Sequence, residues 1–247
     1  MMGNSNLNNK SLFKYKCVNK DNIECLLKNE LYVSCITCMN DPCECNIYID
    51  VEKAKIKLNI LDDNEICRWK NIFEKIVKGC IYCASFCKDG NNEYLWESYA
   101  GNYEGFAIEY NIDDFANALK NAGIGFCDDY IQYVNDNSID FTDSFIKSIK
   151  IDNFSDYTSA NWFFSKNKKW EGEHEYRIVI NTPFEKDIIY NGENKGILIK
   201  NIKPTCIIVG YKINAENLKV INEYCKNNNV LLKMHSKNKT YLYESND

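Results

Sequence analysis

The stretch Trp96–Tyr110, WESYAGNYEGFAIEY, contains a helical turn, a glycine break and a strand within fifteen residues. Trp96, Tyr99 and Ala100 occur at positions i, i+3 and i+4, the spacing that places three side chains on one helical face. From Phe106 the apolar residues recur with a period of two, which is typical of a strand. The stretch therefore predicts a helix followed by a core strand. Its aromatic rings either line a pocket for a planar ligand or fill the core.

The sequence on either side of this stretch predicts further strands and helices in alternation. Because the strands alternate apolar and polar residues, a parallel doubly wound sheet is disfavoured. We expect a disordered segment over 1–10 and a single α+β domain over 11–247, with a mixed, mainly antiparallel sheet flanked by helices. Strands are predicted at 11–17, 31–34, 80–86, 130–134, 173–180, 205–209, 230–235 and 240–245, and helices at 21–29, 69–79, 113–121, 141–154 and 214–227.

Length and composition limit the class of protein. A chain of 247 residues is long enough to bury a sizeable core. The sequence has no run of eighteen apolar residues and its first ten residues contain no apolar signal segment, so we expect a cytoplasmic protein without a membrane partner. The formal net charge of -5 means that the molecule as a whole does not attract nucleic acid. Thirteen cysteines in the cytoplasm are expected to be reduced thiols.

The cysteine spacing gives a weak indication of zinc. Cys35-x-x-Cys38 has the spacing of a structural zinc site, but Cys43-x-Cys45 is too tight for the usual second pair. The chain has two histidines, which cannot supply the missing ligands. We therefore expect no bound metal, and we expect the lone His235 near a strand end to face solvent.

A second informative stretch is Ser165–Ile180, SKNKKWEGEHEYRIVI. Strand alternation in its second half would place Glu173, Glu175 and Arg177 on the same face. Two carboxylates and a guanidinium cannot be buried together without solvent or a ligand to compensate them. The pattern indicates either a cleft with carboxylate chemistry or an exposed edge strand with an Arg–Glu ladder.

Several motifs together resemble a known family. They are the Tyr15-Lys16 pair, Asn40-Asp41-Pro42, Trp96-x-x-Tyr99-Ala100 followed by Gly105, Lys-x-Trp170-x-x-Glu173-x-Glu175-x-Arg177, and Ile-Ile-x-Gly210. Their order over residues 11–243 resembles the bacterial domain-of-unknown-function 2971 family, whose members are often found near phage-defence genes. The order of elements is also similar to that of ADP-ribosyltransferase-like proteins such as DNA-modifying toxins.

This resemblance implies an ADP-ribosyltransferase-like fold and an NAD-dependent transferase or NAD-cleaving toxin in anti-phage defence. Such chemistry passes through an oxocarbenium-like ribose, which needs a carboxylate, a ring that stacks on nicotinamide and a first-strand residue that grips the dinucleotide. The first-strand histidine or arginine and the Ser-Thr-Ser element of that pattern are not visible here. The residues implied are catalytic Glu175, Glu173 and Tyr99, and NAD-binding Tyr15, Lys16, Ser34, Asn40, Asp41, Trp96 and Arg177.

Two other classes of function stay open. A nuclease could hold Mg²⁺ with Asp41, Glu44, Glu173 and Glu175, while the basic run Lys166, Lys168 and Lys169 contacts a phosphate backbone. Alternatively, the protein is a non-enzymatic sensor or immunity protein whose charged strand binds another protein. The expected partners are accordingly a nucleic-acid or protein acceptor and a neutralising antitoxin or sensor.

Overall fold

The computed structural model describes residues 11–41, 47–135, 139–151, 161–181, 188–191, 194–236 and 239–243. The segment 1–10, for which disorder was predicted, lies outside these ranges. The helices are α1 (Lys20–Leu27), α2 (Val51–Leu58), α3 (Asp63–Cys80), α4 (Glu93–Ser98), α5 (Ile112–Asn121), α6 (Thr142–Ile151) and α7 (Ala215–Asn228), with 3-10 turns η1 (Ile36–Cys38), η3 (Asn161–Phe164) and η4 (Lys168–Glu173). The strands are β1 (Ser11–Lys16), β2 (Leu31–Cys35), β3 (Ile47–Tyr48), β4 (Ile81–Cys87), β5 (Phe106–Asn111), β6 (Gly125–Tyr130), β7 (Gln132–Val134), β8 (Ile139–Asp140), β9 (Ser165–Asn167), β10 (Glu175–Asn181), β11 (Ile188–Asn191), β12 (Asn194–Ile199), β13 (Cys206–Gly210), β14 (Leu231–Ser236) and β15 (Lys239–Leu242).

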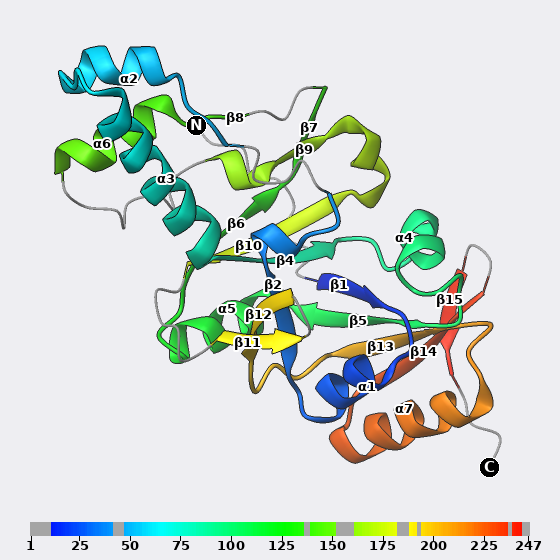
Figure 1. Cartoon of the computed structure of the whole chain (residues 1–247). Coiled ribbons are helices and arrows are strands. Elements are labelled where there is room, and N and C mark those ends of the chain that lie inside the picture. Colours follow the sequence, from blue (N-terminus) through cyan, green and yellow to red (C-terminus); the bar gives the residue numbers. More distant parts are fainter. Residues whose placement is uncertain are drawn as a thin grey trace, which may run out of the picture.

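Eleven of these strands form one sheet (Figure 1). Its main path runs β11-β12-β2-β4-β1-β5-β13-β14-β15, and β10 and β6 continue the sheet from β4. The pair β13–β14 is parallel, and the other pairs described in this sheet are antiparallel. The prediction of a mixed, mainly antiparallel α+β fold is therefore confirmed.

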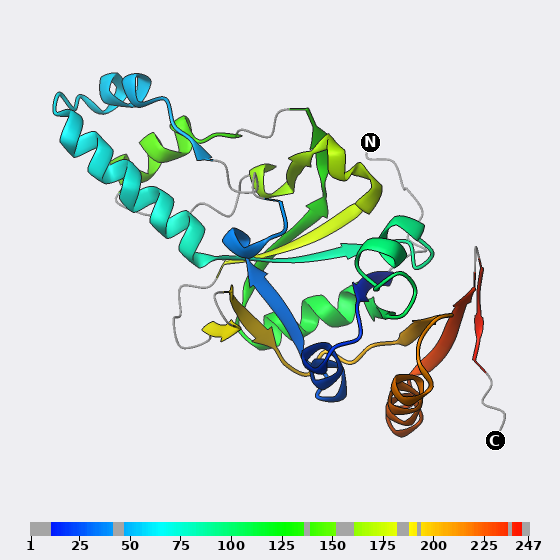
Figure 2. The same cartoon turned by 45° about the vertical axis from the view of Figure 1, so that its right-hand side comes forward.

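Strand β4 is the place where this sheet divides (Figure 2). One edge of β4 pairs with β10 along its full length. The other edge is shared: β2 pairs with Tyr82 and Cys83, whereas β1 pairs with Cys87 through Phe13. Ser85 lies between the two pairing points, opposite neither strand. Since β1 and β2 both run antiparallel to β4, they run in the same direction and diverge, which opens a fork in the sheet.

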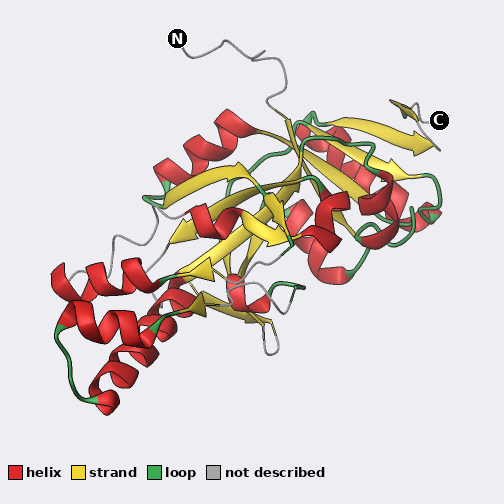
Figure 3. Ribbon diagram, turned by 90° about the horizontal axis from the view of Figure 1, so that it is seen from above, coloured by secondary structure: helices red, strands yellow, loops and turns green. Residues whose placement is uncertain are grey.

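Helices cover the sheet on both faces. Buried side chains of α1, α5 and α7 pack on one face together with alternate residues of β10, namely Tyr176, Ile178 and Ile180. Val179 of the same strand belongs to a second core with α2, α3 and α6. Those three helices gather at one end of the molecule, on the left in Figure 3. No helix within the described ranges is long and apolar enough to cross a membrane.

The stretch around Trp96 folds as predicted, because its local signals agree. The side chain of Asn92 accepts a hydrogen bond from the Leu95 amide and caps α4. A turn then leads to Gly105, where an added Cβ would lie 2.2 Å from the carbonyl oxygen of Lys16. Such an approach is open only to glycine. It brings the start of β5 directly against the end of β1.

The predicted strand over 173–180 is wrong at its start. Glu173 belongs to η4, and His174 has a φ of 45°, a left-handed conformation that interrupts the extended chain. The strand therefore begins at Glu175. The predicted strand over 130–134 is likewise divided between two strands: β6 ends at Tyr130, and β7 begins at Gln132.

Candidate functional site

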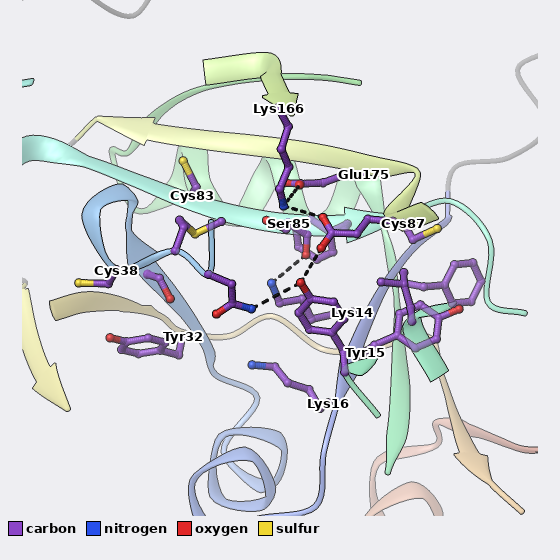
Figure 4. A pocket seen from close by; sticks show the side chains of 18 residues that line it. Lys14, Tyr15, Lys16, Tyr32, Cys38, Cys83, Ser85, Cys87, Lys166 and Glu175 are labelled. Carbon is purple, nitrogen blue, oxygen red and sulfur yellow. Dashed lines mark hydrogen bonds and ion pairs between the residues drawn. The ribbon is translucent and has the colours of Figure 1, made fainter. Parts of the chain in front are cut away.

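A pocket of about 170 Å³ lies in the fork of the sheet (Figure 4). Lys166 and Glu175 lie on one side of it, and Lys14 and Lys16 of β1 lie on the other. Ser85 of β4 lies between them. Seven of the ten residues predicted for the site line this pocket: Tyr15, Lys16, Ser34, Asn40, Tyr99, Glu173 and Glu175.

Two buried carboxylates are held by two cations at one wall of the pocket. The Nζ of Lys166, on β9, lies 2.6 Å from Oε2 of Glu173 and 3.2 Å from Oε2 of Glu175. Arg177 donates from Nε to Oε1 of Glu175 at 2.6 Å and from Nη2 to Oε2 at 3.1 Å. Its Nη1 donates to the carbonyl of Phe163 at 2.9 Å. All four charged side chains are buried, so the carboxylates are fixed in position and shielded from solvent.

The two carboxylates differ in their affinity for a proton. Burial raises the pKa of Glu173, and the neighbouring Lys166 and the Tyr99 hydroxyl offset this only in part. Burial opposes ionisation of Glu175 as well, but Arg177 and Lys166 outweigh it and lower the pKa to about 2. Glu175 is therefore a fixed anion, while Glu173 takes up a proton more readily than an ordinary carboxylate does. Carboxylates whose environments separate their pKa values in this way are typical of acid–base pairs.

Tyr99 connects the carboxylates to the opening of the pocket. Its hydroxyl donates to Oε1 of Glu173 at 2.5 Å and accepts a hydrogen bond from Nδ2 of Asn40 at 3.4 Å. Burial and the hydrogen bond to Glu173 raise the pKa of the phenol, so it stays protonated. Tyr99 follows directly after α4 and thus links the Trp96–Tyr110 stretch to the charged wall.

The opposite wall carries two lysines, Lys14 and Lys16, for which the described ranges provide no carboxylate partner. Lys14 donates from Nζ to the carbonyl of Ser85 at 2.8 Å, and its Nζ lies 5.4 Å from the centroid of the Phe86 ring. Burial, with help from Lys16 and Arg177, lowers the pKa of Lys14 to about 7. Burial also lowers the pKa of Lys16. Within the described part of the chain, no hydrogen bond or ion pair engages the Lys16 ammonium.

Three predicted site residues do not line the pocket, contrary to expectation. Trp96 has no exposed surface, and its indole N–H donates to the carbonyl of Gly90 at 3.0 Å. Asp41 is buried and forms an ion pair with Lys169 at 3.5 Å. Arg177 donates two hydrogen bonds to Glu175 and so positions that carboxylate from behind the pocket lining. Aromatic spacing alone could not distinguish a core ring from a ligand-binding ring.

An aromatic cluster of Tyr15, Trp96, Tyr103 and His235 lies next to the pocket. The hydroxyl of Tyr15 donates to the carbonyl of Asp89 at 2.6 Å and accepts from the Asn92 amide at 3.2 Å, so it already has two protein partners. His235 was expected to face solvent, but it has no exposed surface, and its ring centroid lies 4.7 Å from that of Trp96. The histidine is a core residue because the hairpin of β14 and β15 folds over this cluster.

Two lysines of the site, Lys14 and Lys166, were not identified from the sequence. Lys14 had a detectable signal, since it lies two residues before Lys16 and therefore on the same side of β1. Lys166 was assigned to an exposed basic run, but its side chain is buried against the carboxylates and is not available to a phosphate backbone. Its carboxylate partners lie in a different element, which local pattern cannot reveal.

The metal-dependent alternative gains no support from the described residues. None of them form a group of three or more His, Cys, Asp or Glu side chains able to hold a metal ion. Three residues considered for such sites, Cys43, Glu44 and Cys45, lie outside the described ranges. The oxygens of Glu173 and Glu175 already bind lysine and arginine, which would have to move before a cation could bind there.

Comparison with known proteins supports a family but gives no activity. Residues 95–178 match the family model "Protein of unknown function (DUF2971)". The matched region runs from α4 to β10 and so contains Tyr99, Lys166, Glu173 and Glu175. It does not include the lysines of β1. No curated protein and no solved structure matches the chain.

Proposed function

We propose that the protein breaks the bond between nicotinamide and ribose in NAD, as an ADP-ribosyltransferase or NAD glycohydrolase. The observation that carries this proposal is the buried pair Glu173 and Glu175, one carboxylate fixed as an anion and the other able to exchange a proton. The pair lies across a pocket from Lys14 and Lys16, which form no ion pair with any carboxylate of the described residues. Transfer of a nucleotide-linked ribose uses such a set of groups: an anion for the charge that develops on the ribose, a proton acceptor and a site for phosphate.

The reaction follows from the two carboxylates. As the bond from C1′ to nicotinamide breaks, nicotinamide leaves with the bonding electrons and positive charge develops on the ribose. Glu175 stabilises that charge, and Arg177 and Lys166 keep it ionised where burial would otherwise protonate it. A hydroxyl of water or of an acceptor then bonds to C1′, and its proton passes to the ionised form of Glu173.

The rest of the pocket supplies binding groups. Lys16, unpaired in the described part of the chain, would bind a phosphate of NAD, and the Tyr99 ring would lie against nicotinamide. Ser34 and Asn40 line the same pocket and present polar groups to a ribose. A volume of about 170 Å³ has room for on the order of ten water molecules. That space suits the nicotinamide and its ribose, with the adenosine half outside.

The resemblance seen in the sequence supports a biological role for this activity. The protein would act as a toxin or effector of anti-phage defence in the cytoplasm, with an ADP-ribosyltransferase-like arrangement of its elements. Its acceptor would be nucleic acid, protein or water. A neutralising antitoxin or a sensor would control it, because uncontrolled loss of NAD harms the host cell.

The test is NAD turnover by purified protein, measured as nicotinamide release with cell lysate and nucleic acid as acceptors. We expect Glu175→Gln and Glu173→Gln to lower turnover by a hundredfold or more, about 2.7 kcal/mol of transition-state stabilisation. Glu216→Gln is the matched control, because Glu216 is an exposed carboxylate on α7. EDTA should have no effect on the wild type.

Other outcomes favour other functions. If no NAD is consumed with any acceptor, the proposal is wrong. Cleavage of nucleic acid that EDTA abolishes would support the Mg²⁺-dependent nuclease. Toxicity in cells with neither activity would support a protein-binding role for the charged wall.

A further inference from the structure

Lys14 and Lys166 line the same pocket but have different partners. Lys166 lies within 3.2 Å of two carboxylates and is held as a cation. Lys14 donates to one neutral carbonyl, that of Ser85, at 2.8 Å. No carboxylate within the described ranges forms an ion pair with Lys14. The proposed breakage of NAD gives no task to this second amine.

The fork in the sheet explains why Lys14 stays inside the pocket. The edge of β4 at Ser85 faces neither β1 nor β2, so the Ser85 carbonyl is free to accept from a side chain. Lys14 of β1 reaches it across the gap. The Phe86 ring lies beside the ammonium, 5.4 Å from ring centroid to Nζ. These contacts hold the Lys14 amine inside the pocket, on the wall formed by β1, instead of letting it extend into solvent.

The charges around Lys14 favour its neutral form. Lys16 and Arg177 both oppose a further positive charge, in addition to burial, while the negative charge of Glu175 acts in the opposite direction. With a pKa of about 7, roughly half of the Lys14 amines carry a free lone pair at neutral pH. For an ordinary exposed lysine at pH 7, about one amine in 2,500 is neutral. A desolvated lysine beside other cations is a known route to a nucleophilic amine.

We propose that Lys14 is a nucleophile that forms a Schiff base with the aldehyde of a phosphate-bearing pentose. The Nζ lone pair attacks C1 of the open-chain sugar, a C–N bond forms and the carbonyl oxygen takes up a proton. Loss of water from this carbinolamine gives the imine, and addition of water reverses both steps without any oxidant or reductant. Lys16, two residues along β1, binds the phosphate.

One sugar of this class is the ADP-ribose that would be released by cleavage of NAD. In that form the inference rests on the proposed function, since Lys14 would then capture the product in the pocket where it is made. The reactivity proposed for Lys14 does not itself depend on NAD. Any phosphate-bearing pentose with an accessible aldehyde can be used to test it.

The first experiment incubates native protein with ribose 5-phosphate and cyanoborohydride at pH 7, and peptide mass spectrometry then measures labelling at each lysine. We expect Lys14 to be labelled at least tenfold faster than the exposed Lys120, and expect this difference to disappear in urea. Ribose without phosphate should label Lys14 more slowly. Equal labelling of Lys14 and Lys120 in the native protein would overturn the proposal.

Two variants distinguish the nucleophilic amine of Lys14 from the positive charges of the site. Lys14→Arg keeps the positive charge but has no nucleophilic amine, so its labelling at the site should vanish. Lys16→Arg keeps the positive charge of the proposed phosphate-binding residue, and labelling of Lys14 should persist. If the label were found on Lys16 instead of Lys14 in the wild type, and persisted there in Lys14→Arg, Lys16 would be the reactive residue and the proposal would be wrong.

A second arm replaces ribose 5-phosphate with NAD. If the sugar phosphate labels Lys14 but NAD is not consumed, the proposed function fails and the amine site stands. If NAD is consumed while neither reagent labels Lys14, the Schiff-base proposal fails and the NAD reaction stands.

Discussion

The side chains of Lys166, Glu173, Glu175 and Arg177 are buried against one another at the pocket wall. A cluster of this kind contributes little net stability, because desolvation of the charges offsets most of their attraction. Removal of one member is different, since it leaves an uncompensated charge in a medium that cannot solvate it. The cluster is therefore better understood as a device that fixes two carboxylates than as a source of folding energy.

The first prediction concerns Arg177. Arg177→Met should lower the free energy of unfolding by about 3 to 5 kcal/mol, because Glu175 loses both of its guanidinium hydrogen bonds. Urea unfolding measures the change. Arg68→Met is the control: Arg68 is exposed on α3, and its replacement should change stability by less than about 0.5 kcal/mol. Similar effects for the two variants would contradict the picture of a buried charge cluster.

Considered residue by residue, the sequence predicted part of the site. The residues Glu173, Glu175 and Arg177 were singled out because strand alternation would place them on one face. Two of them do share β10, but Glu173 approaches the pocket from η4. Lys166 was not assigned to the site because η4 separates it from Glu173 and Glu175, although these lie only seven and nine residues away. Lys14 was not assigned because the carbonyl that it reaches, that of Ser85, lies 71 residues further along the chain. Chemical type is readable in sequence, whereas pairing over long separations is not.

Among the elements, the turn between α4 and β5 determines how closely β5 approaches β1. Gly105→Ala should lower stability by at least about 2 kcal/mol, since the new Cβ would lie 2.2 Å from the Lys16 carbonyl and 2.7 Å from that of Ala100. Gly125→Ala in β6 is the control, because its Cβ would meet no atom within 4 Å. Thermal unfolding of both variants checks this. Equal melting temperatures would show that the turn can relax.

The hairpin of β14 and β15 should respond to pH through His235. Burial lowers the pKa of this histidine below its unfolded value, so its neutral form stabilises the fold above about pH 6.5. As the pH falls, the unfolded state takes up a proton that the folded state resists, and stability drops by up to about 1.4 kcal/mol per pH unit.

Urea unfolding between pH 8 and pH 5 tests this dependence. His235→Phe fits an aromatic ring into the same cluster and should remove the contribution of this residue to the pH dependence. His174→Gln changes the other histidine of the chain, which is exposed, and should leave the dependence as in wild type. If the free energy of unfolding of His235→Phe fell with pH as steeply as that of the wild type, His235 would not be buried as described.

Element prediction succeeded where several local signals coincide. A cap, a helical period and a glycine turn all mark the passage from α4 to β5. It failed at His174, where a left-handed residue breaks an otherwise regular alternation. Alternation reports which side chains would share a face if the strand continued, but it does not reveal where the strand begins.

For the whole molecule, the cysteines give a direct measure of how the chain is packed. Cys17 and Cys67 are exposed, and both should react with a maleimide in the native protein. Cys206 and Cys225 are buried and should react only after unfolding. Mass spectrometry of labelled peptides gives the order of reaction. Fast native labelling of Cys206 or Cys225 would show that the core between β13 and α7 is open.

The fold class was predictable because the alternation of apolar and polar residues along each strand is a local property of the sequence. The fork was not, because it depends on how β1 and β2 share one edge of β4, and these strands are far apart in sequence. The place of the pocket therefore had to come from the structure, although seven of its eighteen lining residues had been named as site residues.

The fork also has a consequence for synthesis of the chain on the ribosome. About 160 residues separate Lys14 from Glu175, the two sides of the pocket. At 5 to 20 residues per second, the first side leaves the ribosome about 10 to 30 s before the second. During that interval β4 and β5 are made and can pair with β1, but Glu173 and Glu175 are still missing, so a nascent or prematurely terminated chain contains only the lysine side of the pocket. The order of translation thus delays assembly of the site until most of the protein has been made.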